Sequence, residues 1–482
     1  MIRFLSDPGS TRPFPPLMER SILAALLAIF ILINLLSYQI QPVFSDEPCY
    51  TDPAASYILG RGFTSGAWYA QPDGEFFASN VPLHELALIP WLKVFGFGIV
   101  QSRSINWLYS IIGILLIWDA IRRAGWVTNP ALRLAFCAVT LLTESAYSLN
   151  QLGRPDGITF LIAAMAIWAW VLPSPLWRRG LLFAAGIAAS WAGLQLIAAF
   201  FLICIIGVGI WRLKWITDMI ALGFGIIIGL LGLFVLYQHQ GVWGRFTESV
   251  APNAGNSARD IYAFSGFFSD RSFLLLAVCF GMIFIRTLCA REPSARKPAI
   301  FGTALLLGLP LGLLAFGKFS SHYTWMPALA CTLCAAAALE RSRPGKLFGS
   351  FACGFVLLAV VVGYPRRTGL ALVYADDALH AKSHQFVADH ITNDDRVIYA
   401  AQAYFAVKRI TAKSYYYNWY PAIMSEAEAA AVTVMIIEPR TFSELQSKVG
   451  GQWRSVGEPM SYPVRRFPNR DTWVELLVYK RL

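Results

Sequence analysis

Charged residues are scarce in this 482-residue sequence, and their scarcity excludes most soluble folds. Only 14% of the residues are Asp, Glu, Lys or Arg, whereas 56% are hydrophobic and the mean hydropathy is +0.52. Soluble globular domains carry about 25% charged residues. We therefore expect a membrane protein, in which apolar runs of roughly 17–25 residues cross the bilayer.

The sequence also lacks the motifs of several enzyme classes. Its eight cysteines are scattered, and the single CxxC spacing, Cys331 and Cys334, falls inside an apolar run. This pattern predicts neither a disulfide framework nor a metal site. We find no Gly-rich phosphate loop and no nucleophile motif. No cleavage site follows the first apolar run, so that run is expected to be a membrane helix and not a signal peptide.

The net charge of +11 does not indicate a nucleic-acid-binding protein. The basic residues gather in short turns between apolar runs, such as Arg122-Arg123 and Arg178-Arg179, with tryptophans beside them. Cytoplasmic turns of membrane proteins are enriched in Lys and Arg, and Trp concentrates at the membrane interface. These turns therefore predict a cytoplasmic face, which also holds the basic N-terminus.

The apolar runs from Ile22 to Gly363 predict a polytopic α-helical membrane protein with about eleven transmembrane helices. The run after Arg179 is too long for one span, yet it starts and ends at basic turns. We therefore interpret it as two shorter helices broken near Gly193. An odd number of spans places the C-terminus outside. The spans for which both ends are predicted are Ile22–Ile40, Val100–Ala120, Ala131–Leu149, Thr217–Gln238 and Leu347–Gly363.

The composition divides the chain into two parts near Tyr364, where charged residues, Asn and Gln return. Residues 1–363 are expected to form the transmembrane body, with a large first external loop over residues 41–98. Residues 364–482 alternate helical and strand patterns, which predicts a small soluble α/β domain on the periplasmic side, as a support or recognition module. The expected helices are Leu379–His390 and Phe442–Val449, and the expected strands are Val397–Ala401, Val432–Glu438 and Val474–Tyr479.

The first external loop has three predicted elements. Pro48 suits the first turn of a short helix that ends near Leu59. Strand-like residues on both sides of Pro72-Asp73-Gly74 predict a hairpin. The stretch from Pro82 to Phe95 is predicted to be an amphipathic helix lying along the membrane interface.

Two adjacent acids, Asp46 and Glu47, stand at the outer mouth of the first span. Helix capping is one explanation, because the macrodipole favours an acid at a helix N-terminus and Asp is a good cap. One acid would suffice for that, and charges beside a membrane are costly to desolvate. We therefore favour a catalytic role, in which a carboxylate accepts the proton of an attacking hydroxyl as general base.

Further candidates follow the external ends of later spans. Arg154 and Asp156 could form an ion pair that seals their loop, or Asp156 could support the first-loop acids or the acceptor. Lys318 and His322 suit a phosphate partner, although Lys318 could instead snorkel to lipid headgroups. Tyr323 could be a simple interfacial aromatic residue.

A fourth external region covers residues 239–270, where Trp243 and nearby apolar residues suggest an interfacial helix. Arg259 within this region and Arg271 just after it could bind a lipid phosphate of the substrate. The alternative, which we favour, is that they bind only phospholipid headgroups.

Together these features resemble the GT-C-fold membrane glycosyltransferases, in particular the branch with protein O-mannosyltransferases and the bacterial aminoarabinose transferase of lipid A (glycosyltransferase family 39-like). The resemblance covers the first half of the chain well and the second half loosely. It depends on the order and placement of motifs that are each weak alone. The matching features are Asp46-Glu47 with the following PCYTDPAASYILGRG, the helix VPLHELALIPWLKVFG, Arg103 in QSRSINWL, the Arg154-Pro155-Asp156 loop and His322-Tyr323.

Members of that family transfer a sugar from a polyprenyl-phosphate donor to an acceptor on the periplasmic or luminal side. The resemblance implies that Asp46 is the catalytic base, with Glu47 or Asp156 helping, and that the displacement inverts the anomeric carbon. It places His84 and Asn80 near the substrate. Donor and acceptor contacts are further expected from Arg154, Arg259, Arg271, Lys318, His322 and Tyr323.

Two positions depart from the family pattern. The acid and Lys that precede the Pro-Leu helix in the aminoarabinose branch are replaced here by Ser79 and Asn80. Where many relatives carry a Lys after the Gly of the broken helix, this chain has Leu194 and Gln195 after Gly193. The donor phosphate is therefore expected to be bound elsewhere, and the donor sugar is not predicted.

The sequence thus predicts a polyprenyl-phosphate-sugar-dependent glycosyltransferase of the bacterial inner membrane. Its partners would be an undecaprenyl-phosphate type donor, a lipid, glycan or protein acceptor and membrane lipids. No cofactor is required; a divalent metal is possible, but no metal-ligand spacing supports it. The alternative is a transporter or flippase of lipid-linked sugars, which would call for mid-membrane charges and an internal repeat. An O-antigen ligase or polymerase would instead call for a large late external loop.

Overall fold

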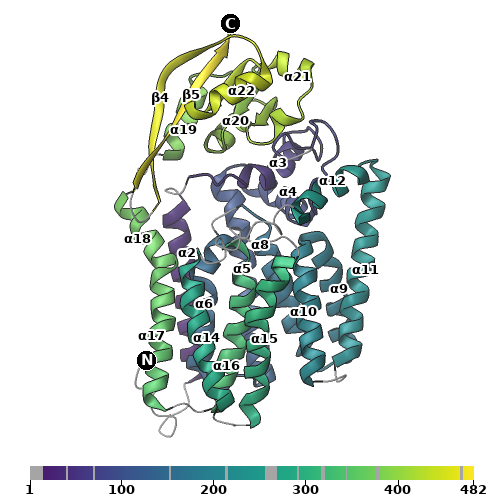
Figure 1. The fold of residues 1–482 in the computed structure, drawn as a ribbon, viewed down its shortest axis with the longest axis vertical. Coiled ribbons are helices and arrows are strands. Elements are labelled where there is room, and N and C mark those ends of the chain that lie inside the picture. Colours follow the sequence, from purple (N-terminus) through teal and green to yellow (C-terminus); the bar gives the residue numbers. More distant parts are fainter. Residues whose placement is uncertain are drawn as a thin grey trace.

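Long apolar helices make up most of the protein, as seen in a computed structural model (Figure 1). They run side by side and form a body, with a smaller helix-and-strand domain at one end. The residues that the structure describes are 15–38, 42–68, 71–150, 153–211, 215–255, 269–289, 293–315, 321–342, 345–374, 379–466 and 470–482.

The body contains most of the helices before residue 375. Their interior faces carry Leu, Ile, Phe and Ala, which pack into one continuous apolar core. The body helices are α2 (Pro16–Tyr38), α5 (Ile99–Ala124), α6 (Pro130–Leu142), α7 (Glu144–Asn150), α8 (Asp156–Trp170), α9 (Pro175–Ala192), α10 (Leu194–Trp211), α11 (Ile216–His239), α14 (Arg271–Cys289), α15 (Pro293–Ala315), α16 (Trp325–Ser342), α17 (Lys346–Val362) and α18 (Tyr364–Tyr374).

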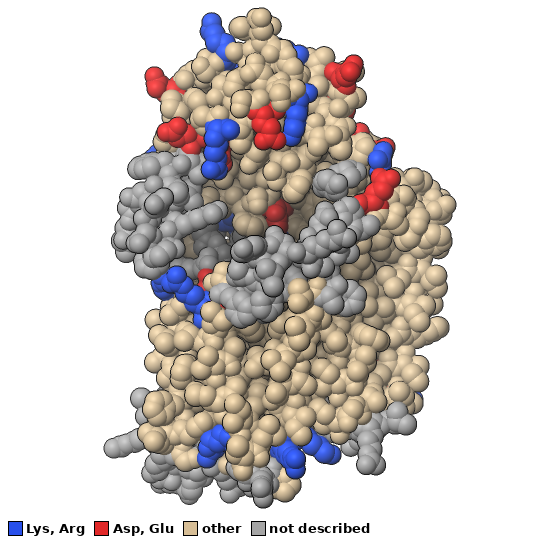
Figure 2. All heavy atoms as spheres, viewed as in Figure 1, with Lys and Arg blue, Asp and Glu red and all other residues tan. Residues whose placement is uncertain are grey.

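The surface of this body has the character of a membrane protein. In the described part of the chain, six helices are long and apolar enough to cross a bilayer, and α6, α8 and α10 are shorter apolar helices. Figure 2 shows a broad band without Lys, Arg, Asp or Glu on the body, between basic residues at its lower end and the many charges above. The protein is therefore an integral membrane protein. The number of eleven spans stays a prediction.

Two helix breaks shape the body. The predicted break at Gly193 is confirmed, because α9 ends at Ala192 and α10 begins at Leu194. The single span predicted over Ala131–Leu149 is wrong, since Thr143 has an extended backbone that separates α6 from α7. The freed N–H of Glu144 binds the Ser272 hydroxyl at 3.0 Å, which satisfies the interrupted helix.

Three shorter helices lie between the body and the C-terminal domain, across the upper ends of the body helices (Figure 1). They are α3 (Glu47–Ile58), α4 (Leu83–Phe95) and α12 (Trp243–Gly255). All three were expected from the sequence. The hairpin predicted around Pro72-Asp73-Gly74 is wrong for the described residues, which form a turn without strands. The Gln71 side chain replaces a strand ladder: its amide bonds the carbonyls of Glu75 and Phe76 and the N–H of Ala78.

The C-terminal domain contains a five-stranded sheet in the order β2-β1-β3-β5-β4. The strand β1 is parallel to β2 and β3, whereas β5 is antiparallel to β3 and β4. This confirms the helices predicted near residues 379 and 442 and the three predicted strands. The elements are α19 (Leu379–Ala388), β1 (Val397–Tyr399), α20 (Tyr404–Ile410), β2 (Ser414–Tyr416), α21 (Glu426–Ala431), β3 (Val434–Ile437), α22 (Phe442–Val449), β4 (Trp453–Arg466) and β5 (Arg470–Arg481), with short 3₁₀ turns at Ser321–Tyr323, Ala401–Ala403, Tyr420–Ala422 and Pro439–Thr441.

The C-terminal domain is not a separate apolar unit. One apolar cluster joins Val43, Cys49, Ala67 and Ile99 of the first loop and α5 to the inner face of the sheet and its helices. The helix that follows residue 363, α18, packs on α2, where the Tyr364 hydroxyl donates to Asn34 at 3.1 Å. The first loop and the C-terminal domain therefore share a core.

Candidate functional site

Asp46, Arg154 and Asp156 form one connected group at the end of the body that faces the C-terminal domain. The Arg154 guanidinium pairs with Asp46 through Nη1 and with Asp156 Oδ2 through Nε at 2.9 Å. Arg154 and Asp156 are buried, whereas the Asp46 side chain is 36% exposed. The group therefore presents one accessible carboxylate, which a buried cation holds in place.

Helix capping does not account for Asp46. The residue occupies the N-cap position of α3, but among the described residues its side chain accepts no hydrogen bond from a helix N–H. Its backbone carbonyl accepts the first helical bond, from Tyr50. The carboxylate instead points to Arg154, which comes from the loop before α8. Arg154 therefore links Asp46 of the first external loop to Asp156 at the start of α8.

Glu47 has a different environment from its neighbour Asp46. Arg103 of α5 binds it at both oxygens, Nε to Oε1 and Nη2 to Oε2, each at 2.7 Å, and both side chains are 1% exposed. The backbone N–H groups of Phe44 and Gly153 donate to the same carboxylate at 2.7 and 2.9 Å. Four donors therefore hold Glu47, and it ties the Asp46 segment to α5 and to the Arg154 loop.

Tyrosines surround the guanidinium of Arg154. Its carbon lies 5.3 Å from the centroid of the Tyr50 ring, a cation–π distance. Burial raises the pKa of Tyr323 to about 12, while the positive charge of Arg154 acts in the opposite direction. The ring of His322 meets the ring of Phe44 at 5.3 Å. The predicted residues His322 and Tyr323 are therefore close to the Asp46 segment.

His84 lies deeper than a direct substrate contact would require. The side chain is fully buried in α4, next to Gly153, and burial lowers the pKa of its imidazole to about 3. The next residue, Glu85, is also fully buried, and burial raises its pKa to about 8. Asn80 is half-buried, and its carbonyl accepts the Tyr237 hydroxyl at 2.5 Å. The predicted substrate-binding role of His84 and Asn80 stays a prediction.

The predicted phosphate-binding cations are only partly covered by the structure. Arg259 and Lys318 lie outside the described residues. Arg271 is exposed at the start of α14, where its backbone N–H donates to Glu144 at 3.2 Å. The preceding Asp270 is buried and accepts the hydroxyls of Ser145 and Thr324, each at 2.6 Å. Asp270 thus fixes the chain next to Tyr323, a role that the sequence did not indicate.

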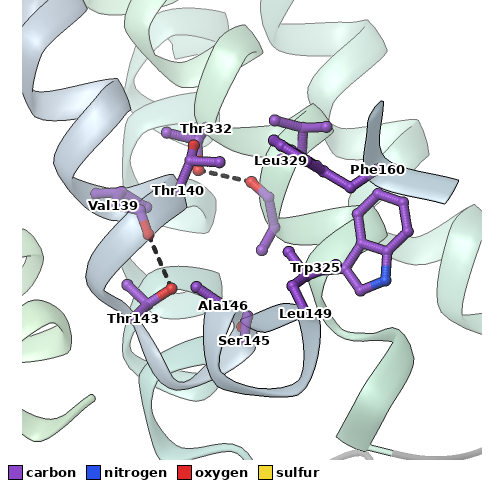
Figure 3. A pocket seen from close by; sticks show the side chains of 11 residues that line it. Val139, Thr140, Thr143, Ser145, Ala146, Leu149, Phe160, Trp325, Leu329 and Thr332 are labelled. Atoms are coloured by element: carbon purple, nitrogen blue, oxygen red, sulfur yellow. Dashed lines mark hydrogen bonds between the residues drawn. The ribbon is translucent and has the colours of Figure 1, made fainter. Parts of the chain in front are cut away.

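A small cavity lies inside the body below this group (Figure 3). Its volume of about 10 Å³ is room for about one water molecule. Thr143 and Thr332 bond the carbonyls of their own helices there, and Phe160 and Trp325 form one wall. A cavity of this size cannot hold a sugar or a prenyl chain. The accessible surface at Asp46 is therefore the better candidate for a substrate site.

Figure 2 shows a hollow between the body and the C-terminal domain. Among the described residues, no group of three or more His, Cys, Asp or Glu side chains lies close enough together to hold a metal ion.

The comparisons with known proteins identify the fold. No protein-family model matches the sequence, and no curated protein sequence matches it. The structure is similar to that of ArnT from Cupriavidus metallidurans bound to undecaprenyl phosphate, with a TM-score of 0.62 and 14% sequence identity over 94% of this chain and 97% of ArnT. It is also similar to ArnT from the same organism in the apo state, with a TM-score of 0.60 and 15% identity over 95% of this chain and 97% of ArnT.

A weaker likeness links the chain to the arabinofuranosyltransferase AftD from Mycobacteria, with a TM-score of 0.43 and 12% identity over 98% of this chain and 42% of AftD. It adds nothing to the ArnT match. At such low identities the similarity establishes the fold. The resemblance to GT-C-fold glycosyltransferases expected from the sequence is confirmed at that level.

Proposed function

We propose that the protein is a membrane glycosyltransferase that moves a sugar from a polyprenyl-phosphate donor, of the undecaprenyl-phosphate type, to an acceptor at the outer face of the membrane. The observation that carries the proposal is the 36% exposed Asp46 carboxylate, which Arg154 holds at the end of an ArnT-like body that faces the C-terminal domain. The undecaprenyl phosphate in the ArnT structure supports the donor class. A lipid, glycan or protein acceptor is compatible with the open hollow.

The proposed topology follows from the charges. Arg122-Arg123 and Arg178-Arg179 lie at the ends of body helices far from Asp46, where they pair with Asp119 and Asp218. Because Lys and Arg are retained on the cytoplasmic side, that end is the inner one. Asp46 and the C-terminal domain then face the periplasm, and a bacterial inner membrane with about eleven spans fits this orientation.

The chemistry of the transfer is a single displacement at the anomeric carbon. The acceptor hydroxyl attacks this carbon, the bond from the carbon to the phosphate oxygen breaks, and the hydroxyl proton moves to Asp46. The configuration inverts, and polyprenyl phosphate leaves as the anion. Cationic side chains stabilise the charge that develops on the phosphate. We assign this role to Arg271 and, from the sequence alone, to Arg259 and Lys318. No cofactor or metal enters this scheme.

Arg154 and Asp156 prepare the base and do not react. The guanidinium binds Asp46 at one edge and Asp156 at another, so the reacting carboxylate keeps one orientation. Fixed geometry of this kind contributes to catalysis because the reacting groups need no reorganisation during the reaction.

Mass spectrometry of cell-envelope glycolipids tests the proposal in cells. A strain without the protein should lack a glycosylated product that the wild-type gene restores and the Asp46→Asn gene does not. Asp394→Asn, an exposed acid of the C-terminal domain, is the matched control and should restore the product. An unchanged profile of glycolipids, glycans and glycoproteins in the strain without the protein would contradict the proposed function.

A further inference from the structure

Helix α3 carries the proposed base at its first residues and a second acid, Asp52, in its middle. Asp46 occupies the N-cap position, and Glu47 is the first residue of the helix and is bound to Arg103 of the body. Asp52 is fully buried on the side of the C-terminal domain. The body therefore holds the start of the helix. Which segment holds its middle depends on the residue that pairs with Asp52.

The partner of Asp52 is Lys408 from helix α20 of the C-terminal domain. The Lys408 Nζ lies 2.8 Å from Asp52 Oδ1, and both side chains are 0% exposed. The other oxygen, Oδ2, accepts the Ser65 hydroxyl at 3.0 Å and the Gly66 N–H at 2.8 Å. One buried ion pair thus joins the proposed catalytic helix, the loop that follows it and the C-terminal domain.

The contact around this pair leaves little freedom of position. The N–H of Tyr416 donates to the Gly66 carbonyl at 2.9 Å, which adds the first loop to the β2 edge of the sheet. A Cβ at Gly66 would lie 2.7 Å from the Ser414 carbonyl oxygen, so the two backbones are in direct contact. Nearby, Arg409 donates to the Phe97 carbonyl at 2.7 Å.

Burying two charges is expensive, and apolar side chains of similar size would stabilise such a contact at least as well. A buried ion pair does, however, fix one relative position, because among the described residues Asp52 and Lys408 each have one oppositely charged partner. The pair therefore fits a positioning role better than a purely stabilising one.

We propose that Lys408 is a positioning residue for Asp46: through Asp52 the C-terminal domain sets the position of α3, and with it the position of the proposed base. The C-terminal domain then helps to position the proposed base, in addition to the support or recognition role expected from the sequence. The effect on turnover rests on the proposed function, whereas the effect on α3 does not.

The test compares Lys408→Met with Lys448→Met, an exposed lysine of the same domain that pairs with Glu444 on the surface. Hydrogen exchange of the 47–58 backbone amides is measured on the full-length protein in lipid nanodiscs. Exchange should accelerate at least tenfold in Lys408→Met and stay unchanged in Lys448→Met. An unchanged rate in a folded Lys408→Met protein would overturn the proposal.

Turnover separates positioning from folding. Sugar transfer is measured per donor-binding site, with an undecaprenyl-phosphate-linked sugar as the probe, so that unfolded molecules do not count. Lys408→Met should lower kcat at least tenfold and change the donor KM less than threefold, and Lys408→Arg should recover part of the loss. A wild-type kcat per site in Lys408→Met would overturn the positioning role.

A second variant covers the case in which Lys408→Met does not fold. Gly66→Ala keeps both charges but forces the two backbones apart at the same contact, and it should give the same pattern of faster α3 exchange and lower kcat. Wild-type exchange and kcat in Gly66→Ala would overturn the proposal. If α3 exchanges faster in the variants but the wild-type protein itself transfers no sugar, the structural coupling between Lys408 and α3 holds and the proposed function is rejected.

Discussion

Glu85 gives a prediction whose size follows from the structure. Its side chain is fully buried in α4, which is not one of the six candidate membrane spans, and burial raises its pKa from 4.5 to about 8. In the unfolded chain the carboxyl loses its proton near the ordinary value. The folded state therefore binds one more proton than the unfolded state between these two pKa values.

The sign follows from this difference. The folded state favours the neutral acid, so stability is fully present below pH 4.5 and is lost as the pH rises to about 8. At about 1.4 kcal/mol per pH unit, the difference reaches about 5 kcal/mol above pH 8, as an upper value. Glu85→Gln keeps the shape of the neutral acid and removes the ionisation.

Thermal unfolding in detergent at several pH values measures this effect. The stability of Glu85→Gln relative to the wild type should rise steadily between pH 5 and pH 8 and then level off. Glu458→Gln, at an exposed position of β4, is the matched control and should show no such trend. A constant difference between Glu85→Gln and the wild type over this whole range would refute the reasoning about burial.

Three further predictions concern the same region. Burial lowers the pKa of His84 from 6.5 to about 3, so the wild type is expected to lose up to about 5 kcal/mol of stability as the pH drops between these values. His84→Gln should remove this acid-dependent loss, which thermal unfolding at pH 4 to 7 would show. Arg103→Met leaves Glu47 buried without its counter-charge and should lower the unfolding free energy by about 3–5 kcal/mol. The Arg103→Met/Glu47→Gln double variant should recover most of this loss. Equal stability of the single and double variants would contradict the pairing. Arg154→Lys keeps the positive charge but loses the planar guanidinium that bridges two carboxylates. The kcat for sugar transfer should therefore fall at least tenfold at unchanged thermal stability. A wild-type kcat would argue against a role of Arg154 in orienting the base.

Local features of the fold were predictable. The helix after Pro48, the break at Gly193 and the helix Phe442–Val449 follow from proline, glycine and hydrophobic spacing, and the structure confirms them. Strand β4 was missed because Gly457, Pro459 and Pro463 mark turns in a short sequence window, whereas here they lie on an edge strand that tolerates them. The hairpin in the first loop was wrong because a side chain, that of Gln71, provides bonds that strands would otherwise supply.

The site was predictable where topology decides it. Asp46 and Arg154 are 108 residues apart. Each follows the external end of a predicted span, so the predicted topology placed both on the same side of the membrane. The ion pairs Glu47–Arg103 and Asp52–Lys408 depend on the packing of distant segments, and no spacing in the sequence encodes a partner. Such partners decide how accessible an acid is: Glu47, held by Arg103, is 1% exposed, whereas the neighbouring Asp46 side chain is 36% exposed.

The most direct test of the central claim is a single turnover with the purified protein, an undecaprenyl-phosphate-linked sugar and the acceptor that mass spectrometry of the strains identifies. Wild type and Asp46→Asn should bind the donor equally well, because the proposed mechanism gives Asp46 the acceptor proton and gives the prenyl phosphate to other residues. Only the wild type should then release undecaprenyl phosphate, with the Asp46→Asn rate lower by about 10²–10⁴-fold. Release at the wild-type rate by a folded Asp46→Asn protein would contradict the role of Asp46 as the base.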